Sequence, residues 1–263
     1  MVYRAEKQNN LEDFLIETVY CDFRDDIIQK IATDFKNKNF ASQNDLAVAL
    51  FHYVRDAILY RLGLWQRKAS ETFREGSGTC TNKANLLVAL LRACSIPAGY
   101  GVMKVKGKEY FGPIILPIFK DYVGEKSVHV YAFVFLNNKW IKCDPSDDID
   151  LSMNTSDLNP QSKLVIWNGK EDALLNLDRE HILEDLGPLS NIDDVISKKP
   201  KNSKSIFLKL ANLYVSFLRQ NKQRAQNKSD LEIIFKGWLL KNNHFFCYLL
   251  LFFGNKFKKC RLK

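Results

Sequence analysis

Residues 78–98 read Gly-Thr-Cys-Thr-Asn-Lys-Ala-Asn-Leu-Leu-Val-Ala-Leu-Leu-Arg-Ala-Cys-Ser-Ile-Pro-Ala. Apolar residues recur here three and four positions apart, which is the spacing of one helix face; they are Ala84, Leu87, Val88 and Leu91. Further apolar residues extend this face to nearly every side, and a helix of that kind is typical of a protein core. The stretch predicts a buried central helix over residues 81–94, which Pro97 ends.

Cys80 stands at the start of this helix, behind Gly76 and Gly78. The N-terminal end of a helix carries about half a positive charge and unpaired N–H groups, and both favour a thiolate over a thiol. Glycines before the cysteine leave room for a substrate carbonyl to approach the backbone. This setting makes Cys80 a candidate nucleophile, and the alternative is a thiol with only a structural role.

The chain on either side of this helix changes from helical to strand periodicity. Two amphipathic helices are predicted over residues 25–35 and 42–62, with Ser42 as a cap, and another over 206–218. Alternating residues predict strands at 100–106, 128–136 and 139–144; residues 107–126 are irregular, and residues 145–200 mix short helical and loop signals. The expected fold class is α+β: N-terminal helices and a central cysteine-bearing helix packed on an antiparallel sheet.

The register of the last predicted hairpin places two polar residues together. If its turn is centred between Asn137 and Asn138, residue 131 faces residue 144, and Asp144 becomes the diagonal neighbour of His129 on one face of the sheet. Asp144 could then accept a hydrogen bond from one imidazole nitrogen, which leaves the other nitrogen for Cys80. A slip of one residue would turn Asp144 to the opposite face.

Three motifs follow one another along the chain. They are the helix around residues 51–60, the Gly-x-Cys helix with Ile-Pro after it, and the strands that hold His129, Trp140 and Asp144. Over about residues 20–150 this pattern resembles the transglutaminase-like superfamily, of bacterial type. The resemblance implies a papain-like fold in which Cys80 is the nucleophile, His129 the base and later the acid, and Asp144 the orienting group. It implies no cofactor and no metal.

The resemblance also implies an oxyanion hole made by the N–H of Cys80 and an upstream side chain. Arg74 stands where papain-like enzymes place a glutamine, so Trp65 and Gln66 are the candidates. Trp140 faces Phe135 across the hairpin and would form an apolar floor for the substrate. The 107–126 segment would lie beside the cleft, either as a lid or specificity loop or as a variable surface loop.

The charge of the chain is unevenly distributed. The net charge is +9, but residues 198–263 hold 16 lysines and arginines against Asp230 and Glu232, which leaves the first 197 residues acidic. We therefore expect a transglutaminase-like catalytic domain over residues 1–200 and a basic, helical extension over 201–263. Because the basic residues are terminal, no specific nucleic-acid binding is expected. Apolar residues and lysines over 231–263 suit either an anionic membrane surface or a helix packed on the body.

Composition excludes several classes of protein. The chain has 263 residues, of which 46% are hydrophobic and 26% charged, and this is ordinary for a globular protein. The longest apolar run, residues 245–253, is far shorter than the roughly 20 residues of a spanning helix. Six cysteines without zinc-like spacing, and a start without a signal-peptide pattern, favour free thiols and a cytoplasmic location.

Together these features predict a cysteine-dependent enzyme that acts on amide bonds of a protein or peptide through a thioester. Hydrolysis by a peptidase or amidase is favoured over cross-linking, because small single-domain bacterial members of the family are more often hydrolytic. The alternative is a binding module that keeps the fold without turnover. The oxyanion donor is the part of the machinery that the sequence leaves open.

Overall fold

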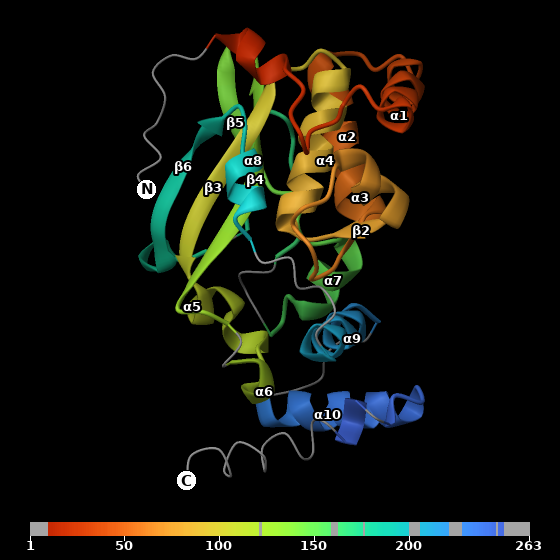
Figure 1. Ribbon diagram of the computed structural model, residues 1–263, viewed down its shortest axis with the longest axis vertical. Helices are drawn as coiled ribbons and strands as arrows, with labels where there is room; N and C mark the ends of the chain where they lie inside the picture. The colour runs from red at the N-terminus through yellow and green to blue at the C-terminus, as the bar shows by residue number, and fades with distance from the viewer. Residues whose placement is uncertain are drawn as a thin grey trace.

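The computed structural model describes residues 10–120, 123–158, 163–175, 177–199, 206–220, 228–245 and 247–249. Figure 1 shows a sheet on one side, a group of helices on the other, and further helices below both. The helices are α1 (Asp26–Lys36), α2 (Gln43–Ala57), α3 (Ala69–Glu75), α4 (Cys80–Ala93), α5 (Gly107–Phe111), α6 (Pro117–Lys120), α7 (Ile149–Thr155), α8 (Asp193–Ser197), α9 (Ile206–Gln220) and α10 (Lys228–Lys241). The strands are β1 (Leu59–Tyr60), β2 (Ser77–Gly78), β3 (Ala98–Lys106), β4 (Lys126–Leu136), β5 (Lys139–Cys143) and β6 (Ile182–Leu189).

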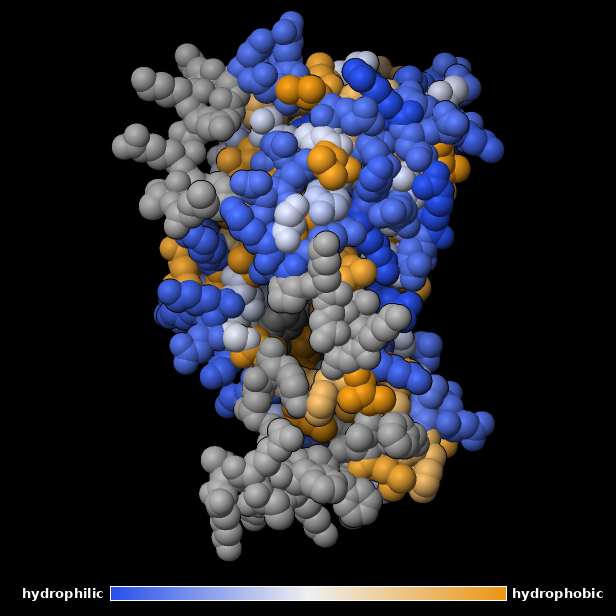
Figure 2. Space-filling view, in the orientation of Figure 1, coloured by the Kyte–Doolittle hydropathy of each residue, from blue (hydrophilic) through white to orange (hydrophobic). Residues whose placement is uncertain are grey.

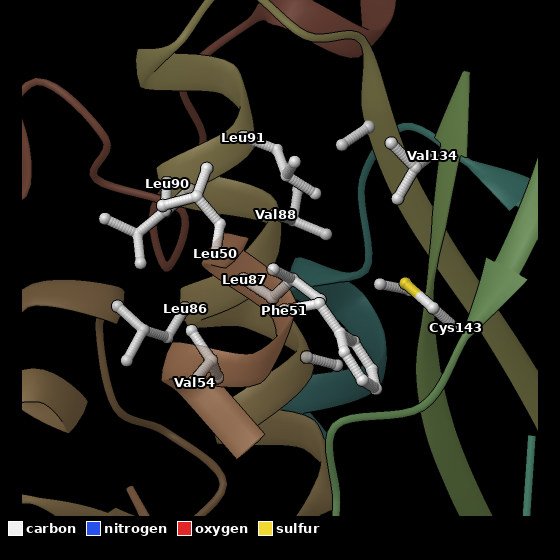
Figure 3. Close-up of a cluster of buried hydrophobic side chains, with 14 of the residues drawn as sticks. Leu50, Phe51, Val54, Leu86, Leu87, Val88, Leu90, Leu91, Val134 and Cys143 are labelled. Atoms are coloured by element: carbon white, nitrogen blue, oxygen red, sulfur yellow. The ribbon is translucent and has the colours of Figure 1, made fainter. Parts of the chain in front are cut away.

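Helix α4 is the centre of the fold, and all of its residues are buried. It lies against α1, α2 and α3 on one side and against β4 on the other. Figure 3 shows the resulting core, in which Leu50 and Phe51 of α2 meet Leu87 and Val88 of α4, with Cys143 of the sheet opposite them. The prediction of a buried central helix is confirmed, with both ends one residue earlier than expected.

The main sheet has the order β5-β4-β3-β6, and all its neighbouring strands are antiparallel. In the β4–β5 hairpin Phe135 pairs with Trp140 and Ala132 with Cys143, so the register predicted from the sequence is confirmed. Asn137 and Asn138 have φ of 51° and 62°, and asparagine tolerates this left-handed region better than most residues. The local turn therefore fixes the pairing that places His129 and Asp144 on one face.

Two predictions about the chain around this core are wrong. The helix expected over 42–62 ends at Ala57, and Leu59–Tyr60 instead forms β1, which pairs in parallel with β2. Residues 182–189, expected to be loop or short helix, form edge strand β6 against β3. Both strands owe their conformation to partners far away in the sequence, so local periodicity did not reveal them.

The connection between β3 and β4 is more regular than expected. Residues 107–120 fold into α5, a 3-10 turn (Gly112–Ile114) and α6. Leu116 and Phe119 of this connection belong to a second hydrophobic cluster together with residues of α7, α9 and α10. This cluster forms the lower part of the molecule in Figure 1.

The C-terminal extension is helical and packed where it is described. The helix predicted over 206–218 is confirmed as α9, and α10 contributes Leu231, Phe235 and Leu239 to the second cluster. The end of the apolar segment and the basic terminus, residues 250–263, lie outside the described residues. None of the helices in the described ranges has the length and hydrophobicity that a membrane span requires.

Candidate active site

A capping box fixes the position of Cys80 at the first residue of α4. The Thr79 hydroxyl accepts the N–H of Asn82, and Asn82 Oδ1 accepts the Thr79 N–H at 3.0 Å. The side-chain amide of Asn82 also donates to the carbonyl of Trp65 at 3.0 Å, which ties the upstream chain to the helix end. Cys80 is held at the helix N-terminus with 9% of its surface exposed.

His129 and Asp144 meet on the face of the sheet that the hairpin register predicts. His129 Nε2 lies 2.6 Å from Asp144 Oδ2, and both side chains are buried. Asp144 Oδ1 accepts the N–H of Ser146 at 3.1 Å and its hydroxyl at 2.5 Å, so the carboxylate is held in place. Because Nε2 donates to the carboxylate, Nδ1 is the nitrogen that can exchange a proton with another group.

Cys80 lies close enough to His129 for the two groups to shift each other's pKa, and His129 in turn bonds to Asp144, so the three side chains converge. Burial raises the pKa of Cys80, but the His129 hydrogen bond and charge and the Val130 N–H leave that pKa below its usual value. Burial lowers the pKa of His129, but the charge of Asp144 and its hydrogen bond hold this pKa well above the usual one. These shifts favour a thiolate beside an imidazolium.

Tyr110 is a member of the site that sequence reasoning missed. Its hydroxyl lies 3.0 Å from His129 Nδ1, and its ring lies 5.5 Å from the imidazole. It comes from α5, in the segment that has no periodicity in the sequence, so no pattern distinguished it from other tyrosines. The segment predicted to lie beside the cleft therefore contacts the imidazole directly.

Two titratable groups beside the triad are also buried. Burial and the charge of Asp144 raise the pKa of Asp147 to about 6. Lys83, one turn after Cys80, donates to the carbonyl of Arg55 at 2.9 Å. Burial lowers the pKa of Lys83 to about 8 against the opposing charges of Asp148 and Asp147. The positive charge of Lys83 on α4 thus balances part of the negative charge of the carboxylates near the triad.

The structure separates the three residues predicted to bind the oxyanion or substrate. Trp65 lines a cavity together with Thr79 and Tyr110, so it lies beside the cysteine. Gln66 Nε2 donates to the carbonyls of Ile196 at 2.9 Å and Lys199 at 2.5 Å, which engages both of its amide hydrogens.

The third residue, Trp140, lies far from the triad. It pairs with Phe135, six residues along β4 from His129, and this spacing amounts to roughly 20 Å of strand. Its ring packs 4.4 Å from that of Phe14. Arg74, at the position where papain-like enzymes place a glutamine, bonds to Asp25.

Two cavities adjoin the site, of about 500 Å³ and about 790 Å³. The smaller one is lined by Trp65, Thr79 and Tyr110, and the larger one includes Asn82 among its walls. Figure 2 shows a hollow between the body and the lower helices, with apolar residues gathered around it. Within the described ranges no group of three or more His, Cys, Asp and Glu side chains is arranged to hold a metal ion.

The chain is similar to known proteins over part of its length. No curated protein matches the sequence. Among solved structures, a protein described as "a Putative Cysteine Protease from Cytophaga hutchinsonii" is similar with 22% identity and a TM-score of 0.40, over 53% of this chain and 43% of that chain. Residues 29–145 match the model of the transglutaminase-like superfamily. This match covers α4, His129 and Asp144, so over residues 29–145 the chain is similar to the transglutaminase-like superfamily.

Proposed function

We propose that the protein is a cysteine-dependent acyl-transfer enzyme that hydrolyses amide bonds of a protein or peptide substrate. The observation that carries the proposal is that Cys80, at a helix N-terminus, lies beside His129, whose Nε2 is 2.6 Å from Asp144 Oδ2. A nucleophile, a base within hydrogen-bond reach and a group that orients the base are the parts that such chemistry needs. All three are buried, so their mutual electrostatic effects are strong.

The reaction would begin when the Cys80 sulfur attacks the amide carbonyl carbon. The negative charge that develops on the carbonyl oxygen is stabilised by the N–H of Cys80 and by the indole N–H of Trp65. His129 then gives its proton to the leaving amine, and a thioester remains on Cys80. In the second half His129 takes a proton from water, which attacks the thioester and releases the acid and the thiolate.

The assignment of Trp65 as the oxyanion donor is supported by elimination among the two upstream candidates. The amide hydrogens of Gln66 are engaged by Ile196 and Lys199, so Gln66 would have to break two hydrogen bonds to donate to a substrate. Trp65 is held next to the helix end by the Asn82 amide and lines the adjoining cavity. An indole nitrogen is a donor only, which suits an oxyanion.

Alkylation with iodoacetamide at pH 6 tests whether the thiol is activated. Cys80 and Cys94 form a matched pair, because they are 9% and 8% exposed. Burial raises the pKa of Cys94 to about 11, whereas the pKa of Cys80 is lowered. We expect Cys80 to react at least ~100-fold faster than Cys94, and His129→Ala to remove this difference. Labelling of Cys80 no faster than Cys94, measured by peptide mapping, would support the alternative of a binding module without turnover.

The choice between hydrolysis and cross-linking is a partition of the thioester between water and an amine. We propose hydrolysis because the site adjoins two cavities, which give water a route to the sulfur. Release of acid in the presence of a primary amine measures this partition. Incorporation of most of the acyl groups into the amine would contradict hydrolysis and leave the cysteine chemistry intact.

We also propose a cytoplasmic location and weak binding to an anionic membrane surface. The five cysteines in the described part of the chain are free, as expected in a reducing compartment. Helix α10 buries Leu231, Phe235 and Leu239, yet Ile233 and Leu240 on its other side are 67% and 44% exposed. Such a surface, beside lysines, is typical of a helix that lies on a membrane.

A further inference from the structure

The smaller cavity adjoins the reacting atoms. Thr79, the residue before Cys80, lines it, and so does Tyr110, whose hydroxyl lies 3.0 Å from His129 Nδ1. Tyr60 also lines it; burial raises the pKa of Tyr60, and Cys80 lies close enough for its charge to raise that pKa further. A group bound in this cavity would therefore belong to a substrate whose amide carbonyl lies next to the Cys80 sulfur.

The walls of the cavity are mostly apolar, and most hydroxyls among them are already engaged within the protein. The hydroxyl of Thr79 bonds to Asn82, that of Thr155 donates to Leu151, and that of Tyr214 donates to Ile114. Among the described lining residues one is charged, Asp147. The cavity therefore offers a ligand few hydrogen bonds, and binding there is favoured by the burial of apolar surface of the ligand.

The far wall of the cavity is built by the C-terminal extension. Phe207, Ala211 and Leu218 of α9 line it, together with Ile115 and Phe119 from the β3–β4 connection. Helix α9 is fixed there by two hydrogen bonds between the Asn212 side chain and the backbone of Leu62, at 2.9 and 2.8 Å. The extension is therefore part of the site rather than an appendage to it.

We propose that this cavity binds a large, uncharged apolar group of the substrate, an aromatic or long aliphatic one, next to the bond that is cleaved. The inference rests on the proposed function, since it needs Cys80 to react. A volume of about 500 Å³ lies within the usual size of small-molecule sites. Helix α9 sets the size of this group, because its Ala211 leaves the space that a larger side chain would fill.

Alkylation of the full chain by two reagents tests the proposal. The Cys80 thiolate displaces iodide from either iodoacetamide or N-hexyl-iodoacetamide and forms a carbon–sulfur bond. Rates are divided by those of N-acetylcysteine with the same reagents, which removes differences in intrinsic reactivity. We expect the hexyl reagent to react with Cys80 at least about tenfold faster than iodoacetamide. A ratio near one would overturn the proposal, whether the cavity is unsuited to carbon chains or is filled by another segment of this chain.

Two variants of α9 test whether the advantage of the hexyl reagent arises in this cavity. Ala211→Trp fills the cavity, and we expect it to bring the ratio of the hexyl-reagent rate to the iodoacetamide rate to about one. Ser216→Trp is the matched control, since Ser216 lines the larger cavity and not this one. An equal loss in both variants would overturn the assignment of the cavity. If Ala211→Trp does not fold, we expect Ala211→Leu to lower the ratio of the hexyl-reagent rate to the iodoacetamide rate.

The outcome separates this inference from the proposed function. A slow, His129-independent reaction of Cys80 with iodoacetamide contradicts the enzyme itself. A fast, His129-dependent reaction without an advantage for the hexyl reagent contradicts only the apolar pocket.

Discussion

At the scale of single residues, the two nitrogens of His129 have different partners. Nε2 is 2.6 Å from Asp144, and Nδ1 is 3.0 Å from the Tyr110 hydroxyl and is the nitrogen left for proton exchange with Cys80. The carboxylate raises the pKa of the imidazole, and the charge of the imidazole in turn lowers the pKa of the sulfur. The reactivity of Cys80 at low pH thus depends on a residue that does not touch it.

Replacing Asp144 by Asn should expose this dependence. The carboxylate raises the pKa of His129, so Asp144→Asn lowers that pKa and removes the ion pair that stabilises the thiolate. We expect alkylation of Cys80 at pH 6 to fall by about 10- to 100-fold. The rate should recover above about pH 8.5, where an ordinary thiol ionises. Rate profiles from pH 5 to 9 that coincide for the two proteins would refute the role of Asp144.

Replacing Tyr110 by Phe should have the opposite effect on the thiol. The hydroxyl occupies Nδ1, the nitrogen that would otherwise be available to the sulfur, and phenylalanine keeps the ring that packs against His129. One hydrogen bond is worth about 0.5–1.5 kcal/mol, so we expect Cys80 to be alkylated about 2- to 10-fold faster in Tyr110→Phe. If turnover of an amide substrate falls while alkylation rises, Tyr110 has a further role in the bound state. A slower alkylation would show that the hydroxyl supports the ion pair.

At the scale of elements, the features predicted from the sequence are those that depend on near neighbours. Cys80, His129 and Asp144 could be placed because the helix signal at residues 81–94 and the Asn137-Asn138 turn are local. Strand β6 and the β1–β2 pair could not, because each depends on backbone partners more than ten residues away. Tyr110 was missed for the same reason, since α5 takes its position from the strands on both sides.

A buried ion pair adds to the hydrogen bonds and apolar contacts that attach α9. Arg219 donates to both oxygens of Asp148, at 2.9 and 2.8 Å, and to the carbonyl of Tyr60 at 2.7 Å. Its side chain is 12% exposed and that of Asp148 is 1% exposed. Because the uncompensated charge of a buried partner is costly, the pair holds the extension onto the start of α7.

Arg219→Met should lower the free energy of unfolding by about 3–5 kcal/mol at pH 7, measured by urea denaturation. The double variant Arg219→Met/Asp148→Asn should regain part of this loss, because it removes the unpaired carboxylate. Arg219 holds the pKa of Asp148 below its usual value against the effect of burial. The stabilisation is therefore present above the unfolded pKa and is lost as the pH falls through the folded one. Equal stability of the single and double variants would contradict a charge-based attachment.

At the scale of the whole molecule, the chain divides by charge and by core. The first 197 residues are acidic, and the lysines and arginines of residues 198–263 give the chain its net charge of +9. The core around α4 lies in the upper part of Figure 1, and the second cluster around α9 and α10 lies below it. Among the labelled elements, helix α10 lies lowest in Figure 1.

That arrangement predicts how the molecule behaves with vesicles. Ile233 and Phe245 are 67% and 60% exposed in the basic region, so insertion of these side chains and attraction of the lysines would act together. We expect the protein to sediment with vesicles rich in phosphatidylserine, less with pure phosphatidylcholine, and less again at high salt. Ile233→Asp/Phe245→Asp should reduce the sedimented fraction at least about fivefold.

Ile166→Asp provides the matched control, because Ile166 is 71% exposed but lies outside the basic extension. It should sediment as the unchanged protein does, since it removes an apolar side chain without touching α10. Equal sedimentation of all three proteins would mean that general charge or aggregation causes the effect. Failure of the unchanged protein to sediment would mean that α10 uses its exposed apolar side chains for something other than a lipid surface.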